Sequence, residues 1–291
     1  IIQKPFPIAK KPDMSDVKKK GFCPMCSENI YEVGARDPRI LNQKLDEKDE
    51  AILMANITPY AKYSLVCRLT EDHYLSLDKF EVKHFSNALE LLVGYLNEVK
   101  KKDDGVNFAS IIMNYLKPAG SSIVHPHLQM LISQYPNDYH KRIYDEGKKF
   151  YRKEEESYWD ALVRKDNKRG IGKTGQLNWL TAFSPRGFEH VKGITMKNLL
   201  EFEKDDIREI SNGIINILRG YHNLNYNSFN ISIFIPPLDK PEGFATVVDM
   251  VTRSNLDKFY WCDVSSISKL QDEPLTNKKP EDVANCFKKL F

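Results

Sequence analysis

The amino-acid sequence predicts an α+β protein built from two similar halves. The order strand, proline-containing turn, strand, helix, strand, loop and strand occurs between residues 51 and 134 and again between 179 and 251. A short matching stretch supports the repeat, since Phe85-Ser-Asn-Ala-Leu resembles Ile210-Ser-Asn-Gly-Ile. We interpret the pattern as a diverged internal duplication. The predicted parts are an N-terminal half at residues 1–137, a charged helix and linker at 138–176, and a C-terminal half at 177–291.

In the first half, two strands are expected at residues 52–54 and 63–67, joined by a turn that contains Pro59. A helix is expected from about Leu77 to Lys100, because apolar residues recur there at steps of three and four. These residues are Phe80, Phe85, Leu89, Leu92 and Leu96. Two further apolar runs, at 108–113 and 130–132, flank a Gly/Ser/Pro loop and are read as strands.

The middle of the chain is strongly charged. Residues 138–168 mix charges with aromatic side chains and are predicted to form one long helix, followed by a basic linker over 165–175. Within that linker Gly170-Ile-Gly172-Lys173-Thr174 resembles the end of a phosphate-binding P-loop, but it lacks the first glycine of that motif. The second half is expected to contain strands at 179–183, 191–195, 230–235 and 245–251 and a helix at 205–224.

The composition limits the classes of protein to which this chain can belong. A hydrophobic fraction of 41% with 29% charged residues is ordinary for a globular chain, and a net charge of +3 argues against nucleic acid or an anionic membrane as partner. No apolar run reaches the ~18 residues of a membrane span and no signal peptide is recognisable. Because the chain starts at Ile1 rather than Met, we expect the native N-terminus to lie upstream. Residues 1–20 are expected to form an extended arm, and residues 34–50 a polar, solvated loop.

Of the five cysteines, only Cys23 and Cys26 are spaced as a unit. The remaining cysteines lie beside apolar residues and are expected to be small buried hydrophobic groups, which favours a reduced, cytoplasmic protein. They are Cys67, Cys262 and Cys286. The Cys-x-x-Cys turn could place two thiolates on one zinc ion, which takes four tetrahedral ligands, and His73 and His125 are the candidates for the other two. The alternatives are a redox pair or a coincidental spacing.

The most informative stretch is His125-Pro-His127-Leu-Gln129, between the loop and the strand that follows it. We expect its two histidines to point in opposite directions, His125 toward a structural partner and His127 toward a ligand, with Gln129 on the side of His127. The alternative is a pair of structural histidines in a strand. The equivalent stretch of the second half, near 245–249, contains no histidine, so only the first half is expected to carry the chemistry.

Together these residues resemble the histidine-triad (HIT) superfamily, and within it the transferase branch of galactose-1-phosphate uridylyltransferase. The resemblance spans about residues 20–255. It rests on Cys23-x-x-Cys26, Asp72-His73, Asn114 with Gly120-x-Ser122, and His125-Pro-His127-x-Gln129. It implies a duplicated HIT-like α+β fold, with two halves that form an antiparallel sheet with flanking helices. It also implies zinc as the metal and a homodimer.

The resemblance further implies a covalent mechanism. His127 would attack the α-phosphorus of a nucleotide sugar or dinucleoside polyphosphate, and a phosphorylated acceptor would then take the nucleotide. Gln129 would donate a hydrogen bond to the transferred phosphoryl group; HIT hydrolases carry a third histidine at its position. Asn114 and Ser122 match phosphate-contacting positions, and Ser121 beside them is a further substrate-binding candidate. Asn56 is a candidate for the nucleoside pocket or simply a turn residue.

Two departures from the family pattern leave the substrate open. Leu128 stands where the uridylyltransferases have glycine and is more similar to the diadenosine tetraphosphate phosphorylases, and Leu116 also replaces a glycine. A galactose substrate therefore does not follow. The alternatives are a phosphorylase that uses inorganic phosphate as acceptor and a zinc-stabilised nucleotide-binding module without turnover. A HIT-type hydrolase is disfavoured by Gln129.

Overall fold

The computed structural model describes residues 14–18, 21–37, 45–239, 243–256 and 262–291. Ten strands form a single antiparallel sheet in the order β1-β2-β3-β5-β4-β9-β10-β8-β7-β6. The strands are β1 (Asp46–Lys48), β2 (Ala51–Ala55), β3 (Tyr63–Arg68), β4 (Phe108–Tyr115), β5 (His127–Ser133), β6 (Gly170–Thr174), β7 (Leu177–Thr181), β8 (Phe188–Thr195), β9 (Phe229–Phe234) and β10 (Thr246–Thr252).

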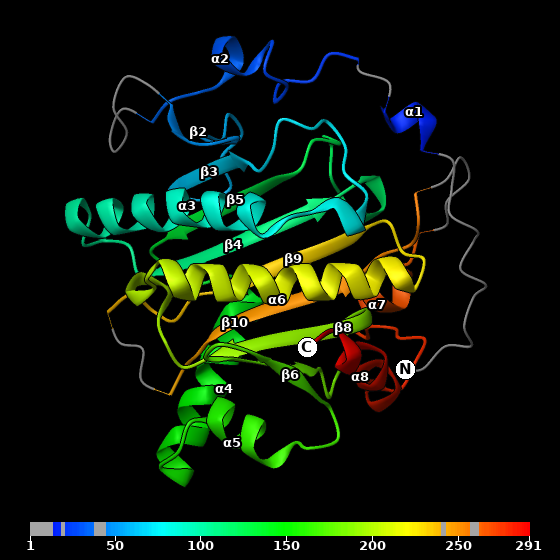
Figure 1. The fold of residues 1–291 in the computed structure, drawn as a ribbon. Helices are drawn as coiled ribbons and strands as arrows, with labels where there is room; N and C mark the ends of the chain where they lie inside the picture. The colour runs from blue at the N-terminus through cyan, green and yellow to red at the C-terminus, as the bar shows by residue number, and fades with distance from the viewer. Residues whose placement is uncertain (1–13, 19–20, 38–44, 240–242, 257–261) are drawn as a thin grey trace.

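Two long helices lie side by side across one face of this sheet, and the others are shorter or peripheral (Figure 1). The α-helices are α1 (Ser15–Lys18), α2 (Ile30–Val33), α3 (Val82–Lys102), α4 (Asp138–Glu154), α5 (Tyr158–Lys165), α6 (Lys204–Asn223), α7 (Ser266–Leu270) and α8 (Pro280–Phe287). The 3-10 turns are η1 (Leu77–Lys79), η2 (Lys117–Ala119), η3 (Leu199–Glu201) and η4 (Lys288–Leu290). The predicted α+β class, with an antiparallel sheet and flanking helices, is confirmed.

The predicted duplication is visible in the strand order. The run β2-β3-β5-β4 is mirrored by β7-β8-β10-β9, and the central β4–β9 pair joins the halves with Asn114 opposite Asn230. The long helices α3 and α6 both follow a 3-10 turn and both begin with a capping box, at Glu81 and Glu203. β10 therefore occupies in the second half the place that β5 occupies in the first.

The two faces of the sheet are covered differently. On one face α3 and α6 pack over a continuous apolar core that includes Phe85, Met130 and Trp179. The opposite face carries only two smaller clusters, one around Cys23 and Cys26 over β2 and β3, and one between α5 and the β7–β10 end. Between these clusters the strands present partly exposed side chains. They are Ile112, Asn114, Gln129, Asn230 and Ser232.

Some expectations from the sequence are corrected. The predicted long helix is two helices, because the chain turns at Glu155 with φ +53° and Ser157 then caps α5 by accepting from the Trp159 amide at 3.2 Å. The stretch interpreted as a linker includes the strand β6, which pairs with β7. Part of the predicted polar loop forms β1. Of the predicted N-terminal arm, residues 1–13 and 19–20 lie outside the described residues, and residues 15–18 form α1.

The unpaired cysteines differ in burial. Cys67 is buried as expected, but Cys262 and Cys286 are exposed. For Cys286 the reason is helical phase, since α8 buries Val283 and Phe287 and turns the cysteine outward. Within the described part of the chain, no helix combines the length and apolarity needed to cross a membrane.

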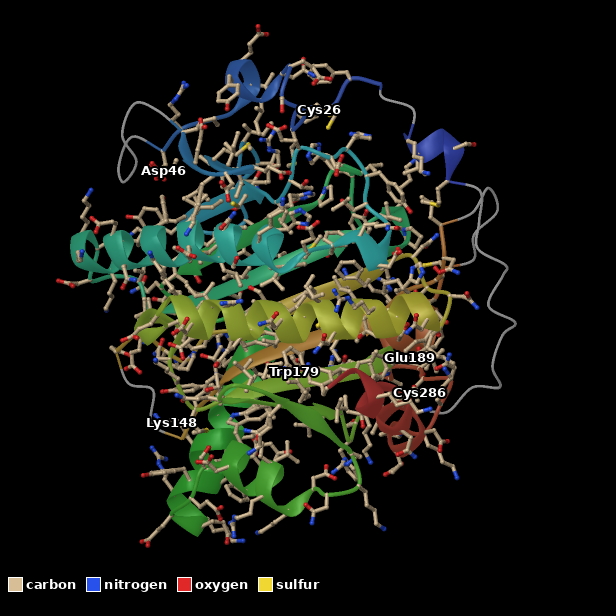
Figure 2. All side chains as sticks on the ribbon, in the orientation of Figure 1. Cys26, Asp46, Lys148, Trp179, Glu189 and Cys286 are labelled. Carbon is tan, nitrogen blue, oxygen red and sulfur yellow. The ribbon has the colours of Figure 1, made fainter. Side chains whose placement is uncertain are left out.

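Trp179, which lies behind α6 in Figure 2, requires two glycines. A Cβ atom on Gly213 of α6 would collide with its indole ring, and one on Gly193 of β8 would lie 2.8 Å from it. The ring cannot easily move away, because its Nε1–H donates to Thr174 Oγ1 at 2.8 Å and the side chain is 1% exposed. The second helix thus packs on the sheet only where glycine permits close approach.

We expect Gly213→Ala to lower the free energy of unfolding by about 1–3 kcal/mol, the usual result of overpacking a core. Gly94→Ala is the matched control, because Gly94 is exposed in the interior of α3 and a Cβ there meets nothing within 4 Å. That change should instead raise stability by about 0.5–1 kcal/mol. Urea denaturation of both variants measures the difference, and equal stability would contradict the packing described for α6.

Candidate active site and metal centre

Four potential zinc ligands converge at the edge of the first half. The ligand atoms of Cys23, Cys26, His73 and His125 all lie within 4.8 Å of one another. The Nδ1 atom of His125 is 3.7 Å from Cys23 Sγ and 3.6 Å from Cys26 Sγ, and His73 Nδ1 is 3.5 Å from Cys26 Sγ. Tetrahedral zinc with Zn–S of ~2.3 Å and Zn–N of ~2.05 Å requires sulfur–nitrogen separations of about 3.6 Å. The quartet therefore fits zinc in both chemistry and spacing.

The Cys-x-x-Cys turn, at the upper edge of the molecule in Figure 2, is held from two sides. Asn29 Nδ2 donates to the Cys23 carbonyl at 2.9 Å. From β3 the buried Arg68 donates to the Met25 carbonyl at 3.3 Å and to Ser27 Oγ at 3.1 Å. The thiolates are thus positioned by backbone contacts that form independently of the histidines.

The tautomer of His125 is set by its second nitrogen. Nε2–H donates to the Thr70 carbonyl at 2.7 Å, so Nδ1 presents its lone pair toward the cysteines, as a metal ligand requires. Burial also lowers the pKa of His125 to about 4, which keeps the ring neutral. Zinc bound here would cross-link the N-terminal turn to the segment that carries His127.

His127 is the first residue of β5 and lies opposite Arg68 of β3. Its Nδ1–H donates to the carbonyl of His125 at 2.8 Å, so Nε2 carries the lone pair. The Gln129 amide nitrogen lies 3.3 Å from that Nε2 atom. Burial lowers the pKa of His127, which favours the neutral imidazole. An uninterrupted strand would place residues i and i+2 on one face. Because His125 precedes β5, its ring has other partners than the ring of His127.

Asn114 lies on β4, on the same face as Gln129, and belongs to a hydrogen-bonded chain that crosses into the second half. Asn230 Nδ2 donates to Asn114 Oδ1 at 2.7 Å, and Arg253 Nη1 donates to Asn230 Oδ1 at 2.9 Å. Asp263 in turn holds Arg253 through two contacts of 2.7 Å. Because its oxygen is engaged, Asn114 is oriented to offer its amide nitrogen to an anion. Asn230 falls within the strand predicted at 230–235 and Arg253 lies just past the one predicted at 245–251, so the sequence pattern marks neither as a site residue.

The two serines of the loop after β4 are placed differently. Ser121 is buried and its hydroxyl donates to the Ile123 carbonyl at 2.6 Å, whereas Ser122 is exposed. The loop starts at Leu116, which is fully buried with φ +67° and ψ 166°, and later turns at Gly120 with φ +87°. Positive φ explains why a glycine suits the position of Leu116.

Asn56 lies in the β2–β3 turn, away from His127. Its Oδ1 accepts from the backbone and hydroxyl of Thr58, at 3.0 and 3.2 Å, so it shapes the turn. Beside this turn is a cavity of about 250 Å³ whose lining includes Tyr60, Ser110 and Leu131. Leu131 lies two residues after Gln129 on the same face of β5. The cavity therefore lies farther along the face of β5 that begins with His127. This cavity has no signature in the sequence, because the fold brings its lining together from separate stretches of the chain.

We expect Cys23→Ser to lose bound zinc and to unfold more readily, because a structural zinc ion contributes its binding energy to folding. Zinc content measured by metal analysis should fall from near one per chain toward zero, and the melting temperature should fall with it. Cys286→Ser, at an exposed cysteine outside the quartet, is the control and should change neither. Full zinc retention in Cys23→Ser would exclude the four-ligand assignment.

Comparisons with known proteins identify a related sequence and solved structures of similar fold. No family model matches the chain. A protein of Archaeoglobus fulgidus described as uncharacterized is 37% identical over 296 residues, covering 100% of this chain and 88% of that protein. A uridylyltransferase mutant structure aligns with a TM-score of 0.76 at 14% identity, covering 92% of this chain and 93% of the other. An ADP-glucose phosphorylase from Arabidopsis thaliana aligns with a TM-score of 0.75 at 15% identity, covering 93% and 90%.

Proposed function

This chain belongs to the same family as the Archaeoglobus fulgidus protein and has the uridylyltransferase-like fold of the HIT superfamily, and we propose on that premise that it is a nucleotidyltransferase. It would move a nucleoside monophosphate from a nucleoside diphosphate sugar to a phosphorylated acceptor through a nucleotidyl-His127 intermediate. The observation that carries the proposal is the fixed tautomer of His127. Its Nδ1–H is held by a backbone carbonyl, so Nε2 is a nucleophile at neutral pH.

The chemistry proceeds in two displacements. His127 Nε2 attacks the α-phosphorus, the N–P bond forms, and the bond to the bridging oxygen breaks, so that a sugar phosphate leaves. An oxygen of the acceptor phosphate then attacks the same phosphorus, and the N–P bond breaks to restore the imidazole. Gln129, now 3.3 Å from Nε2, would shift its amide to a phosphoryl oxygen when the substrate arrives, which stabilises charge without a proton transfer.

The nucleoside would lie along β5. Side chains at 127, 129, 131 and 133 share one face with about 7 Å between successive positions, so the cavity beside Leu131 begins within a nucleoside's reach of the reacting phosphorus. Tyr60 and Tyr135 in its lining are exposed rings on which a base can stack. Asn114, held by Asn230, would contact a phosphate oxygen.

Zinc bound by the quartet would supply structural support and no step of the reaction. The chain's own groups do the positioning. The His125 carbonyl orients His127, and Thr70 orients the His125 ring.

A phosphorylase that uses inorganic phosphate is the second candidate, and the fold shared with the ADP-glucose phosphorylase supports it. Leu128 does not decide between the two. Its side chain is 1% exposed and packs in the core under the helices, opposite to Gln129, so the replacement of glycine there alters packing rather than acceptor contacts.

We expect wild-type protein mixed with a donor to gain the mass of one nucleoside monophosphate, and His127→Ala to gain nothing. Intact mass is measured at neutral to mildly alkaline pH, because phosphohistidine is acid-labile. The donors are UDP-glucose, ADP-glucose, GDP-mannose and diadenosine tetraphosphate, each tested separately. His222→Ala, at a partly exposed histidine of α6, is the control and should keep the adduct. Tight nucleotide binding without any adduct would favour the binding module.

The isolated adduct then distinguishes the acceptors, since release by galactose-1-phosphate or by inorganic phosphate identifies transferase or phosphorylase activity.

Gln129→His should raise hydrolysis relative to transfer, because a titratable imidazole at this position can activate water, an effect worth ~10²–10⁴-fold in general acid–base catalysis. The measurement is the ratio of free nucleoside monophosphate to transferred product from one donor. Gln129→Ala is the control, since it removes the hydrogen bond to the phosphoryl group without adding a base, and it should slow both routes. An unchanged ratio in Gln129→His would refute the role given to Gln129.

A further inference from the structure

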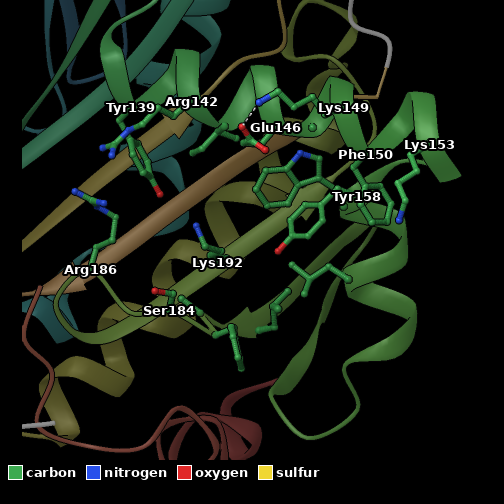
Figure 3. Close-up of a pocket in the computed structure, with 17 residues that line it drawn as sticks. Tyr139, Arg142, Glu146, Lys149, Phe150, Lys153, Tyr158, Ser184, Arg186 and Lys192 are labelled. Carbon is green, nitrogen blue, oxygen red and sulfur yellow. Dashed lines mark hydrogen bonds and ion pairs between the residues drawn. The ribbon is translucent and has the colours of Figure 1, made fainter. Parts of the chain in front are cut away.

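A cavity lies in the second half, between helices α4 and α5 and the outer strands of the sheet. It has a volume of about 650 Å³, within the ~300–1,000 Å³ range of small-molecule sites. Its lining combines aromatic rings with basic groups (Figure 3). The mechanism proposed above uses none of these residues.

The aromatic side chains provide flat walls. Tyr158 packs edge-on against Phe150 at 5.6 Å and against Trp159 at 5.2 Å between ring centroids, and Tyr139 forms the other side of the cavity. Phe183 at the rim is 76% exposed. Walls of this kind bind planar aromatic groups by stacking.

Two guanidinium groups lie together beside the Tyr139 ring. Arg186 Cζ is 4.5 Å and Arg142 Cζ is 5.8 Å from the ring centroid. Both donate to the single carboxylate of Asp272, at 3.2 and 3.0 Å. Two cations that share one carboxylate leave an excess positive charge. A guanidinium has five donors, so both groups can still bind a phosphate.

The floor of the cavity carries a third cation. Lys192 on β8 points into the space between Tyr139 and Tyr158 (Figure 3). Burial opposes its charged form, but the ion pair with Asp249 raises the pKa of Lys192, so it stays protonated. His190 Nε2–H donates to Asp249 at 3.0 Å, and its Nδ1 accepts from the Arg186 backbone amide at 3.0 Å. Through His190 and Asp249, these contacts fix the position of Arg186 relative to Lys192.

The cavity is separate from the His127 site. One row of paired residues crosses the sheet from Gln129 through Ile112, Ser232 and Asp249 to Lys192. Four strand spacings of ~4.8 Å put about 19 Å between its ends. The strand residues of the cavity lining come from β7 and β8, which take the places of β2 and β3 in the second half, and Lys192 lies on the same face of the sheet as Gln129.

We propose that this cavity is a second ligand site that binds a nucleoside phosphate, with the base among the aromatic rings and the phosphate at Arg142, Arg186 and Lys192. Such a ligand matches both the aromatic rings and the basic groups of the lining, because it joins a planar ring system to an anion that guanidinium groups bind bidentately. The proposal does not depend on the reaction at His127.

Calorimetric titration of the full chain with AMP, and separately with UMP, tests the proposal. We expect two nucleotides per wild-type chain for at least one of them. The double variant Arg142→Gln/Arg186→Gln should bind one of the two about tenfold or more weaker, since charge-assisted hydrogen bonds are lost. The control Lys141→Gln/Arg164→Gln removes the same charge from exposed positions of α4 and α5 outside the cavity and should keep both sites. Circular dichroism and melting temperature verify that each variant is folded.

Trp159 fluorescence assigns the second binding event to the cavity. Nucleotide should change the emission of wild-type protein at the concentration where the second site fills, and Trp159→Phe should lack this change. One nucleotide per chain with no Trp159 signal would overturn the proposal while leaving the nucleotidyl-His127 experiment unaffected. Equal affinity for inorganic phosphate and for nucleotide would also overturn it, because the base would then contribute nothing.

Discussion

His125 is the constraint on which the candidate site depends, because its side chain and its backbone act on different partners. Its ring joins Cys23, Cys26 and His73, and its carbonyl accepts the Nδ1–H of His127. Whatever fixes His125 in the metal quartet therefore also fixes the carbonyl that sets the tautomer of His127. This coupling follows from the order of the chain, since His125 lies just before Pro126 and His127 begins β5.

The arrangement of the layers explains why a site exists at this place. Helices α3 and α6 close one face of the sheet completely, while the other face is closed only at its ends, by the Cys-x-x-Cys segment and by α4 and α5. The strands in the middle therefore alternate between core residues on one side and partly exposed residues on the other. Polar side chains such as those of Gln129, Asn114 and Asn230 can lie on this partly exposed side of the middle strands without loss of core packing.

The sequence predicts the features that depend on short stretches of the chain. Both long helices and the main strands follow from periodicity, and the Cys-x-x-Cys spacing marks half of the metal quartet. The need of zinc for four ligands points to His73 and His125, which lie 47 and 99 residues from Cys26. Long-range register could not be read in this way, so the contact between Asn114 and Asn230, separated by 116 residues, was missed. The break between α4 and α5 was also missed, because Glu155-Glu156 contains neither glycine nor proline; only the N-cap Ser157 marked it.

Leu116 combines a left-handed backbone conformation with a large side chain. Its positive φ costs of the order of 1–3 kcal/mol in a residue with a side chain. Full burial of that side chain returns about 1.5–3 kcal/mol, so the two effects nearly cancel. The Leu116 carbonyl also accepts from the amides of Ala119 and Ser121, at 3.1 and 3.3 Å. A leucine anchored in the core therefore holds the start of this loop more firmly than glycine would, which fixes the loop relative to Asn114.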